Sequence, residues 1–275
     1  KVKQLFFHKI GGFALSQTSP IIIYVYTTLT VVALYGNYML IVMGVQTLMT
    51  AMFNSMNAGI GNLVAEGDKR KIMSVFAELF SIRFLFSCIM CFGVLMITPA
   101  FVSFWIGKKY VMDSLSLLLM TAILFVNLSR TTVDAYINAY GLFGDIWAPI
   151  VEASLNVGLS IILGYYFGLH GVLSGVLISL LLVVFCWKPY YLFRKGLDER
   201  LSIYIFMYAR HLMAALLCGV IVCLGMRYSM VQGDTTFFDG LLGILVFSIL
   251  STLTLLCVAP GMRNLMRRFI RMCHV

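Results

Sequence analysis

The sequence predicts an all-α, polytopic membrane protein with about eight transmembrane helices. The first observation is composition: the chain is 61% hydrophobic and 11% charged, whereas soluble domains are near half apolar and a quarter charged. The second is length, because the apolar residues form eight stretches of roughly the 20 residues that a helix needs to cross a bilayer. The third is that the basic residues gather in alternate gaps between these stretches.

The predicted spans follow one another with short connections. They cover residues 10–30, 33–58, 74–98, 114–139, 146–167, 169–188, 203–226 and 239–260. None alternates with period two, which excludes the strands of a membrane barrel. Pro20 predicts a kink inside the first span. Gly168 to Gly171 predicts a tight turn, and glycines at 164, 168, 171 and 175 have the four-residue spacing of closely packed helices.

The placement of positive charge predicts the orientation of the spans. One set of gaps and ends holds Lys1, Lys3, Lys9, Lys69, Arg70, Lys71, Lys188, Arg194, Lys195, Arg200, Arg263, Arg267, Arg268 and Arg271. The other set holds only Lys108, Lys109 and Arg227. This bias predicts that both termini are cytoplasmic. The net charge of +9 therefore points to the headgroups of a lipid bilayer, and no nucleic acid partner is expected.

We expect four segments along the chain. Residues 1–190 hold the first six spans, residues 191–202 form a cytoplasmic connector, and residues 203–260 hold the final transmembrane pair. In the tail, residues 261–275, arginines recur every fourth residue at 263, 267 and 271. Apolar residues lie largely on the other side, which predicts a short amphipathic helix on the membrane surface.

Arg130 and Asp134 are the first candidate site, because a charge inside a bilayer costs several kcal/mol unless it meets a partner or water. Their spacing places both on one helix face. Asn127 and Asn138 extend this polar stripe. The stripe either joins helices as a self-neutralised pair or lines a cavity that meets a polar substrate or a coupling ion.

Arg83, inside the third span, is a further candidate for the substrate path. Its guanidinium group suits a phosphate, and the equally weighted alternative is that it extends to the membrane interface. The sequence lacks the motifs of hydrolases, nucleotide-binding enzymes and metalloproteases, and its scattered histidines predict no metal site. We therefore expect a chain that is not an enzyme and has no cofactor.

Several local strings resemble those of the Wzx-like polysaccharide flippases of the MATE-like (MOP) superfamily. The series runs from about residue 35 to 190. Its members are Tyr35–Tyr38, Gly61–Ala65, Pro99–Gly107, Trp147–Asn156, Gly168–Gly175 and Trp187–Tyr190. Two positions depart from the pattern. Ser19 and Pro20 stand where relatives often carry an acidic residue, and Val176 stands where a threonine often follows the glycine.

The resemblance implies a function and a set of partners. Such flippases move an undecaprenyl-diphosphate-linked glycan across the bacterial inner (cytoplasmic) membrane, through a cavity between two helical bundles. The chain resembles their C-terminal half, with a MATE-like C-terminal bundle plus two extra helices. The expected partner is then the missing N-terminal helical bundle, on the same or a neighbouring polypeptide. The absence of an initial Met agrees with this expectation.

Two other functions stay open on the residues alone. A cation-coupled multidrug exporter of the same superfamily would rely on deep acidic groups, of which Asp134 is the one the sequence offers. A membrane enzyme, such as a polysaccharide polymerase or an acyltransferase, would need catalytic residues in a large outer loop. The longest outer loop, 227–238, holds Asp234 but no convergent set of catalytic residues.

Overall fold

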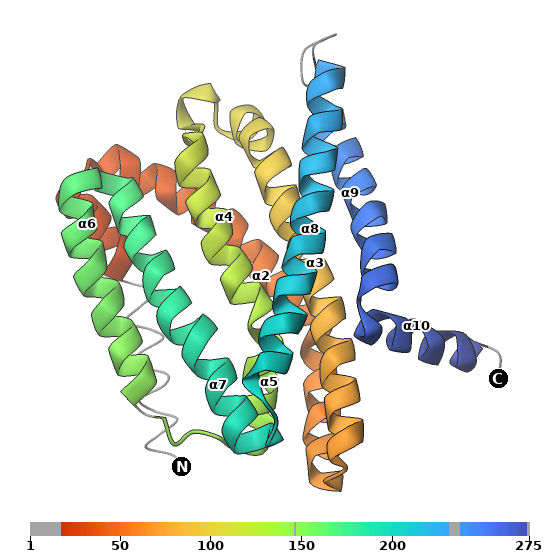
Figure 1. Cartoon of the computed structure of the whole chain (residues 1–275). Helices are drawn as coiled ribbons and strands as arrows, with labels where there is room; N and C mark the ends of the chain where they lie inside the picture. Colours follow the sequence, from red (N-terminus) through yellow and green to blue (C-terminus); the bar gives the residue numbers. More distant parts are fainter. Residues whose placement is uncertain (1–17, 146, 231–236, 274–275) are drawn as a thin grey trace. The chain divides into compact units, whose positions relative to one another are not determined.

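The computed structural model describes residues 18–145, 147–230 and 237–273, and every regular element in those ranges is helical (Figure 1). Six helices in the described ranges are long and apolar enough to cross a membrane. One of them, Trp147–Leu197, contains two predicted spans. Residues 10–17 of the predicted span 10–30 lie outside the described residues, as do Lys1, Lys3, Lys9 and residues 231–236 of the predicted loop 227–238. The all-α, polytopic membrane class is confirmed.

The chain divides into two compact units. The first unit comprises the chain up to Asn62 together with Val111–Asp198, and the second comprises Leu63–Tyr110 together with Glu199 onward. The division differs from the predicted segment of residues 1–190. The third predicted span groups with the final transmembrane pair, because the helix that contains it packs on both helices of that pair.

The first unit is built from helices that follow one another with few loops. They are a helical stretch over 18–26, α2 (Leu29–Glu66, extending just past the unit boundary), α4 (Ser114–Ser129), α5 (Thr131–Tyr140), α6 (Trp147–Ser179), the π-helical η2 (Leu180–Trp187), α7 (Lys188–Leu192) and the π-helical η3 (Phe193–Leu197). Val126 of α4 and Val184 of η2 belong to one buried apolar cluster. The helical path ends at Asp198, whose φ of 56° is left-handed. The predicted connector 191–202 is therefore helical as far as Leu197.

The helix α6 is a tight hairpin, as the glycines predict. Gly168 has φ 57° and ψ −130°, and the helix reverses direction there. The arms approach so closely that a Cβ on Gly171 would lie 1.9 Å from the carbonyl oxygen of Leu163. Ser160 donates a hydrogen bond to the carbonyl oxygen of Val172 across the hairpin, at 3.3 Å. Backbone-to-backbone packing of this kind is possible only where glycine removes the side chain.

The second arm of α6 passes smoothly into a helix that contains Pro189. Proline has no N–H group and its ring clashes with the carbonyl of the fourth residue before it. The residues before Pro189 are π-helical from Leu180 to Trp187, which widens the turn ahead of the ring. The predicted span 169–188 stopped at this proline, whereas the structure carries the helix past it to Leu197.

Polar contacts fix one end of the first unit. The backbone N–H of Met112 donates to the hydroxyl of buried Tyr38 at 2.9 Å, which ties α2 to the start of α4. Asp113 caps α4 by accepting from the N–H of Ser116 at 3.0 Å, and it also accepts from His170 at 2.8 Å. Partial desolvation opposes ionisation of Asp113, but these hydrogen bonds lower the pKa of its carboxyl group to about 2. The cap therefore stays ionised at neutral pH.

The second unit packs one long helix against a helical pair. Its elements are α3 (Lys69–Trp105), the short 3₁₀ turn η1 (Lys108–Tyr110), α8 (Leu201–Met230), α9 (Phe237–Val258) and α10 (Pro260–Cys273). Asp68 begins α3 as a side-chain cap that accepts from the N–H groups of Arg70 and Lys71. Phe92 of α3 stacks on Phe247 of α9 with ring centroids 4.3 Å apart.

A buried histidine joins α8 to α3 in the second unit. His211 is fully buried, and Phe80 and Phe84 contact its ring edge-on. Its Nδ1 lies 2.7 Å from the carbonyl oxygen of Met207, and its Nε2 lies 2.9 Å from the Ser81 hydroxyl. Both ring nitrogens therefore have partners, as a buried polar group requires.

Replacement of Gly171 by alanine is expected to destabilise the α6 hairpin by at least about 2 kcal/mol, because the added methyl group collides with backbone atoms that cannot move aside. Gly158→Ala is the matched control on the same helix. A Cβ there meets nothing within 4 Å, so the change is expected to be neutral or stabilising by up to about 1 kcal/mol. Thermal unfolding of the purified variants in detergent measures the difference. Equal melting temperatures for the two variants would contradict the hairpin packing.

Candidate functional site

Arg130 lies at a break in the predicted span 114–139. It separates α4 from α5 and has φ −73° and ψ −16°. The hydroxyls of Ser129 and Thr131 donate to the carbonyl oxygens of Val126 and Leu128, at 3.3 and 2.8 Å. Hydroxyl groups that bind the preceding turn compete with the helical hydrogen bonds and bend helices. The backbone hydrogen bonds Arg130 N–H to Val126 O and Asp134 N–H to Arg130 O continue through this point, so the four-residue spacing places Asp134 on the next turn of the same face.

Asp134 contacts two cations at once. Its Oδ2 lies 3.3 Å from Nε of Arg130, and its Oδ1 lies 3.1 Å from Nζ of Lys188 on α7. The Lys188 side chain is only 20% exposed, so water contributes little to its solvation. The carboxylate therefore contacts one cation that is four residues away, Arg130, and a second cation, Lys188, that is more than fifty residues further along the chain.

Glu152 on α6 completes a cluster of four charges with Arg130, Asp134 and Lys188, which we call the charge cluster. Glu152 is 6% exposed, and its carboxyl group interacts electrostatically with Arg130 and Lys188. Within the described residues it forms no ion pair closer than 4 Å. The cluster contains two cations and two anions, so its formal charges cancel.

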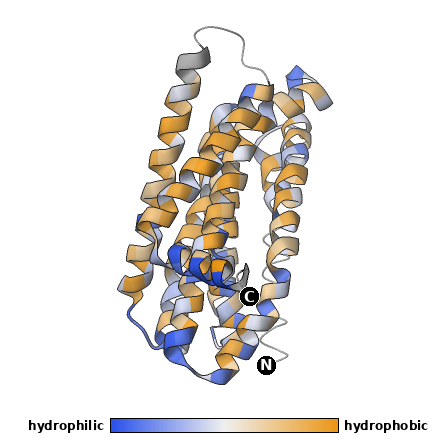
Figure 2. Ribbon diagram, turned by 90° about the vertical axis from the view of Figure 1, so that its right-hand side faces the viewer, coloured by the Kyte–Doolittle hydropathy of each residue, from blue (hydrophilic) through white to orange (hydrophobic). Residues whose placement is uncertain are grey.

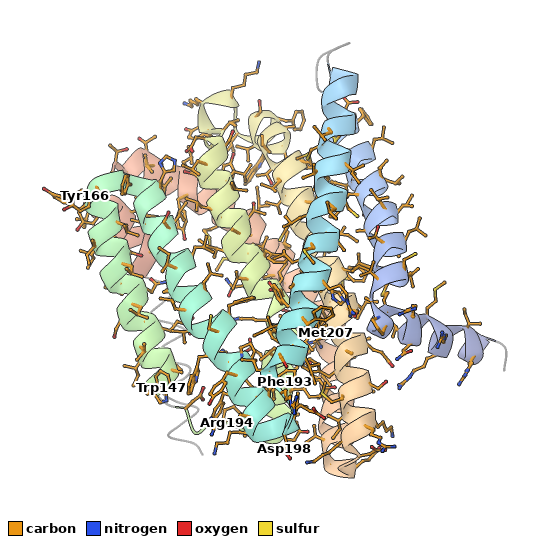
Figure 3. The ribbon with its side chains drawn as sticks, viewed as in Figure 1. Trp147, Tyr166, Phe193, Arg194, Asp198 and Met207 are labelled. Atoms are coloured by element: carbon orange, nitrogen blue, oxygen red, sulfur yellow. The ribbon has the colours of Figure 1, made fainter. Side chains whose placement is uncertain are left out.

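The charge cluster lies in the half of the first unit that contains Trp147. Figure 3 shows Trp147 at the same end as Phe193, Arg194 and Asp198, with Tyr166 at the opposite end of the first α6 arm. Glu152 follows Trp147 by five residues and Lys188 precedes Asp198 by ten, which corresponds to roughly 8 Å and 15 Å at 1.5 Å per residue.

A buried amide extends the polar surroundings of Glu152. Asn156, one turn further along α6, donates to the hydroxyl of Ser179 at 3.2 Å across the hairpin. Its Oδ1 is buried and has no hydrogen-bond partner in the part of the chain that the structure describes. A buried acceptor without a partner is costly unless water or a ligand group donates a hydrogen bond to it.

The other sequence-predicted residues take different positions. Asn127 donates to the carbonyl oxygen of Ile123 in its own helix, at 3.0 Å, and Asn138 is exposed. Arg83 belongs to the second unit, on α3, and is 2% exposed. Burial this complete differs from the predicted alternative in which Arg83 extends to the membrane interface. Of the five predicted residues, Arg130 and Asp134 form an ion pair with each other.

Sequence reasoning missed Lys188 and treated it as one more basic residue in a gap. The apolar residues on both sides of Lys188 would have revealed that it lies inside a helix. That apolar run continues to Phe193 if Pro189 is allowed inside the helix. Glu152 and Asn156 lie one turn apart on α6. The hairpin at Gly168 is what turns that pair toward Ser179 and the charge cluster.

A second polar feature, on α2, was also missed. Four exposed polar residues of α2 are spaced three or four residues apart and therefore share one face of the helix: Thr47, Thr50, Asn54 and Asn57. We call them the α2 stripe. Val42, Met49, Phe53 and Ile60 form the adjacent buried face. Polar groups of this kind on a membrane helix meet water or other polar helices rather than lipid.

Replacement of Asp134 by asparagine is expected to lower the free energy of unfolding by about 1–3 kcal/mol, because it leaves two poorly solvated cations without their shared anion. The control is Lys71→Gln, which removes an exposed ion pair with Glu66 and is expected to change stability by less than about 0.5 kcal/mol. Thermal unfolding in detergent compares them. Adding Lys188→Leu to Asp134→Asn is expected to recover part of the loss. If Asp134→Asn has the same melting temperature as the control variant, the charge cluster does not stabilise the first unit.

Comparison with known proteins finds no match to the chain among protein-family models, curated proteins or solved structures. The resemblance to polysaccharide flippases therefore rests on the sequence strings, and the charge cluster and the α2 stripe stand on their own geometry.

Proposed function

We propose that the chain is part of a flippase that moves a lipid-linked oligosaccharide across the bacterial cytoplasmic membrane. The observation that carries the proposal is the charge cluster inside an apolar helical unit, with Asp134 held between Arg130 and Lys188. The sequence strings that resemble polysaccharide flippases supply the substrate class, an undecaprenyl-diphosphate-linked glycan. A glycan cannot cross hydrocarbon unaided, since each unpaired polar group costs several kcal/mol.

The shared carboxylate gives the cluster a way to receive an anion. If Arg130 turns toward a diphosphate, Asp134 keeps Lys188 as its partner and is not left unpaired. Arginine then offers the planar donor pair that suits phosphate oxygens. The α2 stripe supplies neutral hydrogen-bonding groups of the kind that contact sugar hydroxyls. The lipid tail of the substrate stays in the bilayer throughout.

The proposal includes the surroundings of the chain. Its partners are the lipid bilayer and an N-terminal helical bundle, on the same or a neighbouring polypeptide, that forms the opposite wall of the path. The bias of basic residues supports cytoplasmic termini. Alternating access then rocks one bundle against the other.

Cation-coupled export of drugs or organic cations is the second candidate, and Glu152 favours it. This carboxyl group is buried, and in the described part of the chain it has no ion pair within 4 Å. A poorly solvated carboxyl group near cations is the kind of group that exchanges a proton or a metal cation during transport. Glu152 is thus a second buried acidic group in addition to Asp134.

Flipping of a labelled lipid-linked oligosaccharide in proteoliposomes tests the first candidate. The assay uses the chain together with the neighbouring helical bundle from its source. Arg130→Ala is expected to slow flipping by roughly tenfold or more, because a charge-assisted hydrogen bond contributes about 1.5–3 kcal/mol. Arg194→Ala, which removes an exposed arginine of the same unit, is the matched control and is expected to leave the rate unchanged.

Two outcomes would contradict these assignments. Normal flipping by stably inserted Arg130→Ala and Asp134→Asn variants would remove the charge cluster from the path. Efflux of a cationic dye driven by a proton or sodium gradient, with no flipping of the glycan lipid and with loss of efflux in Glu152→Gln, would support the second candidate in place of the first.

A further inference from the structure

The helix α10 presents an apolar edge and a basic edge to its surroundings. Figure 2 shows it as a mainly hydrophilic segment, near the C mark, attached to hydrophobic helices. Arg263, Arg267 and Arg271 are exposed and spaced by four residues, so they form the basic edge. Met266 and Ile270 are 48% and 47% exposed and form the apolar edge beside them. The two edges are those of a helix that lies in a membrane interface.

Firm packing fixes α10 on the second unit. A Cβ on Gly261 would lie 2.3 Å from the carbonyl oxygen of Ala77 on α3. Met262 joins a buried cluster with Leu85 of α3 and with apolar residues of α8 and α9. Further along, Arg268 forms an ion pair with the buried Glu78 at 3.3 Å. The direction of the basic edge is therefore set by the fold, and α10 turns sharply away from the direction of α9 rather than extending it (Figure 1).

Another arginine, Arg210, lies beside α10 and has no acidic partner within the described residues. The guanidinium carbon of Arg210, on α8, lies 5.7 Å from the centre of the Phe206 ring. Its Nε is buried and has no hydrogen-bond partner in the described part of the chain. Met262, the neighbour of Arg263, packs in one buried cluster with Ala214, which follows Arg210 by one turn of α8. The positive charges of Arg210 and Arg263 therefore lie close enough to interact. Within the same described ranges, no acidic side chain pairs with either arginine.

Like charges held together beside an unpartnered buried donor are unfavourable unless an anion joins them. We propose that Arg210 and Arg263 bind the phosphate group of an anionic membrane phospholipid, with Met266 and Ile270 against its acyl chains. Two guanidinium groups offer the forked donors that suit phosphate oxygens. The exposed apolar edge selects a lipid over a soluble anion, because only a lipid brings acyl chains to that edge.

Equilibrium binding of a fluorescent short-chain phosphatidylglycerol to the purified full chain in detergent tests the site. Arg263→Gln changes an exposed side chain and leaves the packing of α10 intact, so it is the first variant. It is expected to weaken binding about tenfold, and Arg210→Gln is expected to do the same. Arg271→Gln is the matched control, since Arg271 lies on the same basic edge two turns further on. It is expected to weaken binding by less than about threefold.

Competition experiments identify the ligand. Unlabelled phosphatidylglycerol is expected to displace the probe, whereas phosphatidylcholine and inorganic phosphate at equal concentration are not. Equal weakening by Arg263→Gln and Arg271→Gln would overturn the two-arginine site and leave diffuse attraction to the basic edge. Displacement by inorganic phosphate at the concentration of the lipid would overturn the lipid assignment. Equal affinity for phosphatidylcholine would overturn both.

Discussion

A charge inside an apolar helical protein needs an opposite charge or water beside it, and Asp134 supplies the opposite charge for both Arg130 and Lys188. The contact joins α5 to α7, which are also neighbours in the packing of the first unit. Removing one partner from such a group leaves an uncompensated charge, which costs far more than the pair contributes. The positions of α5, α7 and the first arm of α6 around Glu152 follow from this neutralisation.

Close backbone contact is the second constraint, and it acts where side chains are absent. In the first unit, Gly171 and Gly175 let the arms of α6 touch, with Gly168 supplying the turn. In the second unit, Gly261 lets α10 touch α3. Without a strong hydrophobic drive between helices in lipid, such close van der Waals packing supplies much of the cohesion. Both units combine a few fixed polar contacts with these glycine contacts.

The sequence predicted what depends on local spacing and missed what depends on contacts between distant segments. Helix length and apolar runs predicted the membrane class, and the glycines predicted the turn at Gly168. The four-residue spacing of Arg130 and Asp134 predicted their contact. No periodicity in a helix reveals that Lys188 reaches Asp134 across the chain, or that Arg83 belongs with α8, α9 and α10. Asn127 donates to the carbonyl oxygen of Ile123 in its own helix, and its place in the polar stripe stays a prediction.

Because the chain is made from its N-terminus onward, the contacts of the two units become possible at different times. The contacts of the α6 hairpin join residues only 12 to 23 positions apart, so that hairpin can form as soon as its second arm enters the bilayer. The helix α3 must wait, because the contact between Ser81 and His211 spans 130 residues. During that interval α3 carries Arg83, Glu78 and its serines in the membrane without the helices that later cover them. The second unit is therefore completed only after its C-terminal helices have been made.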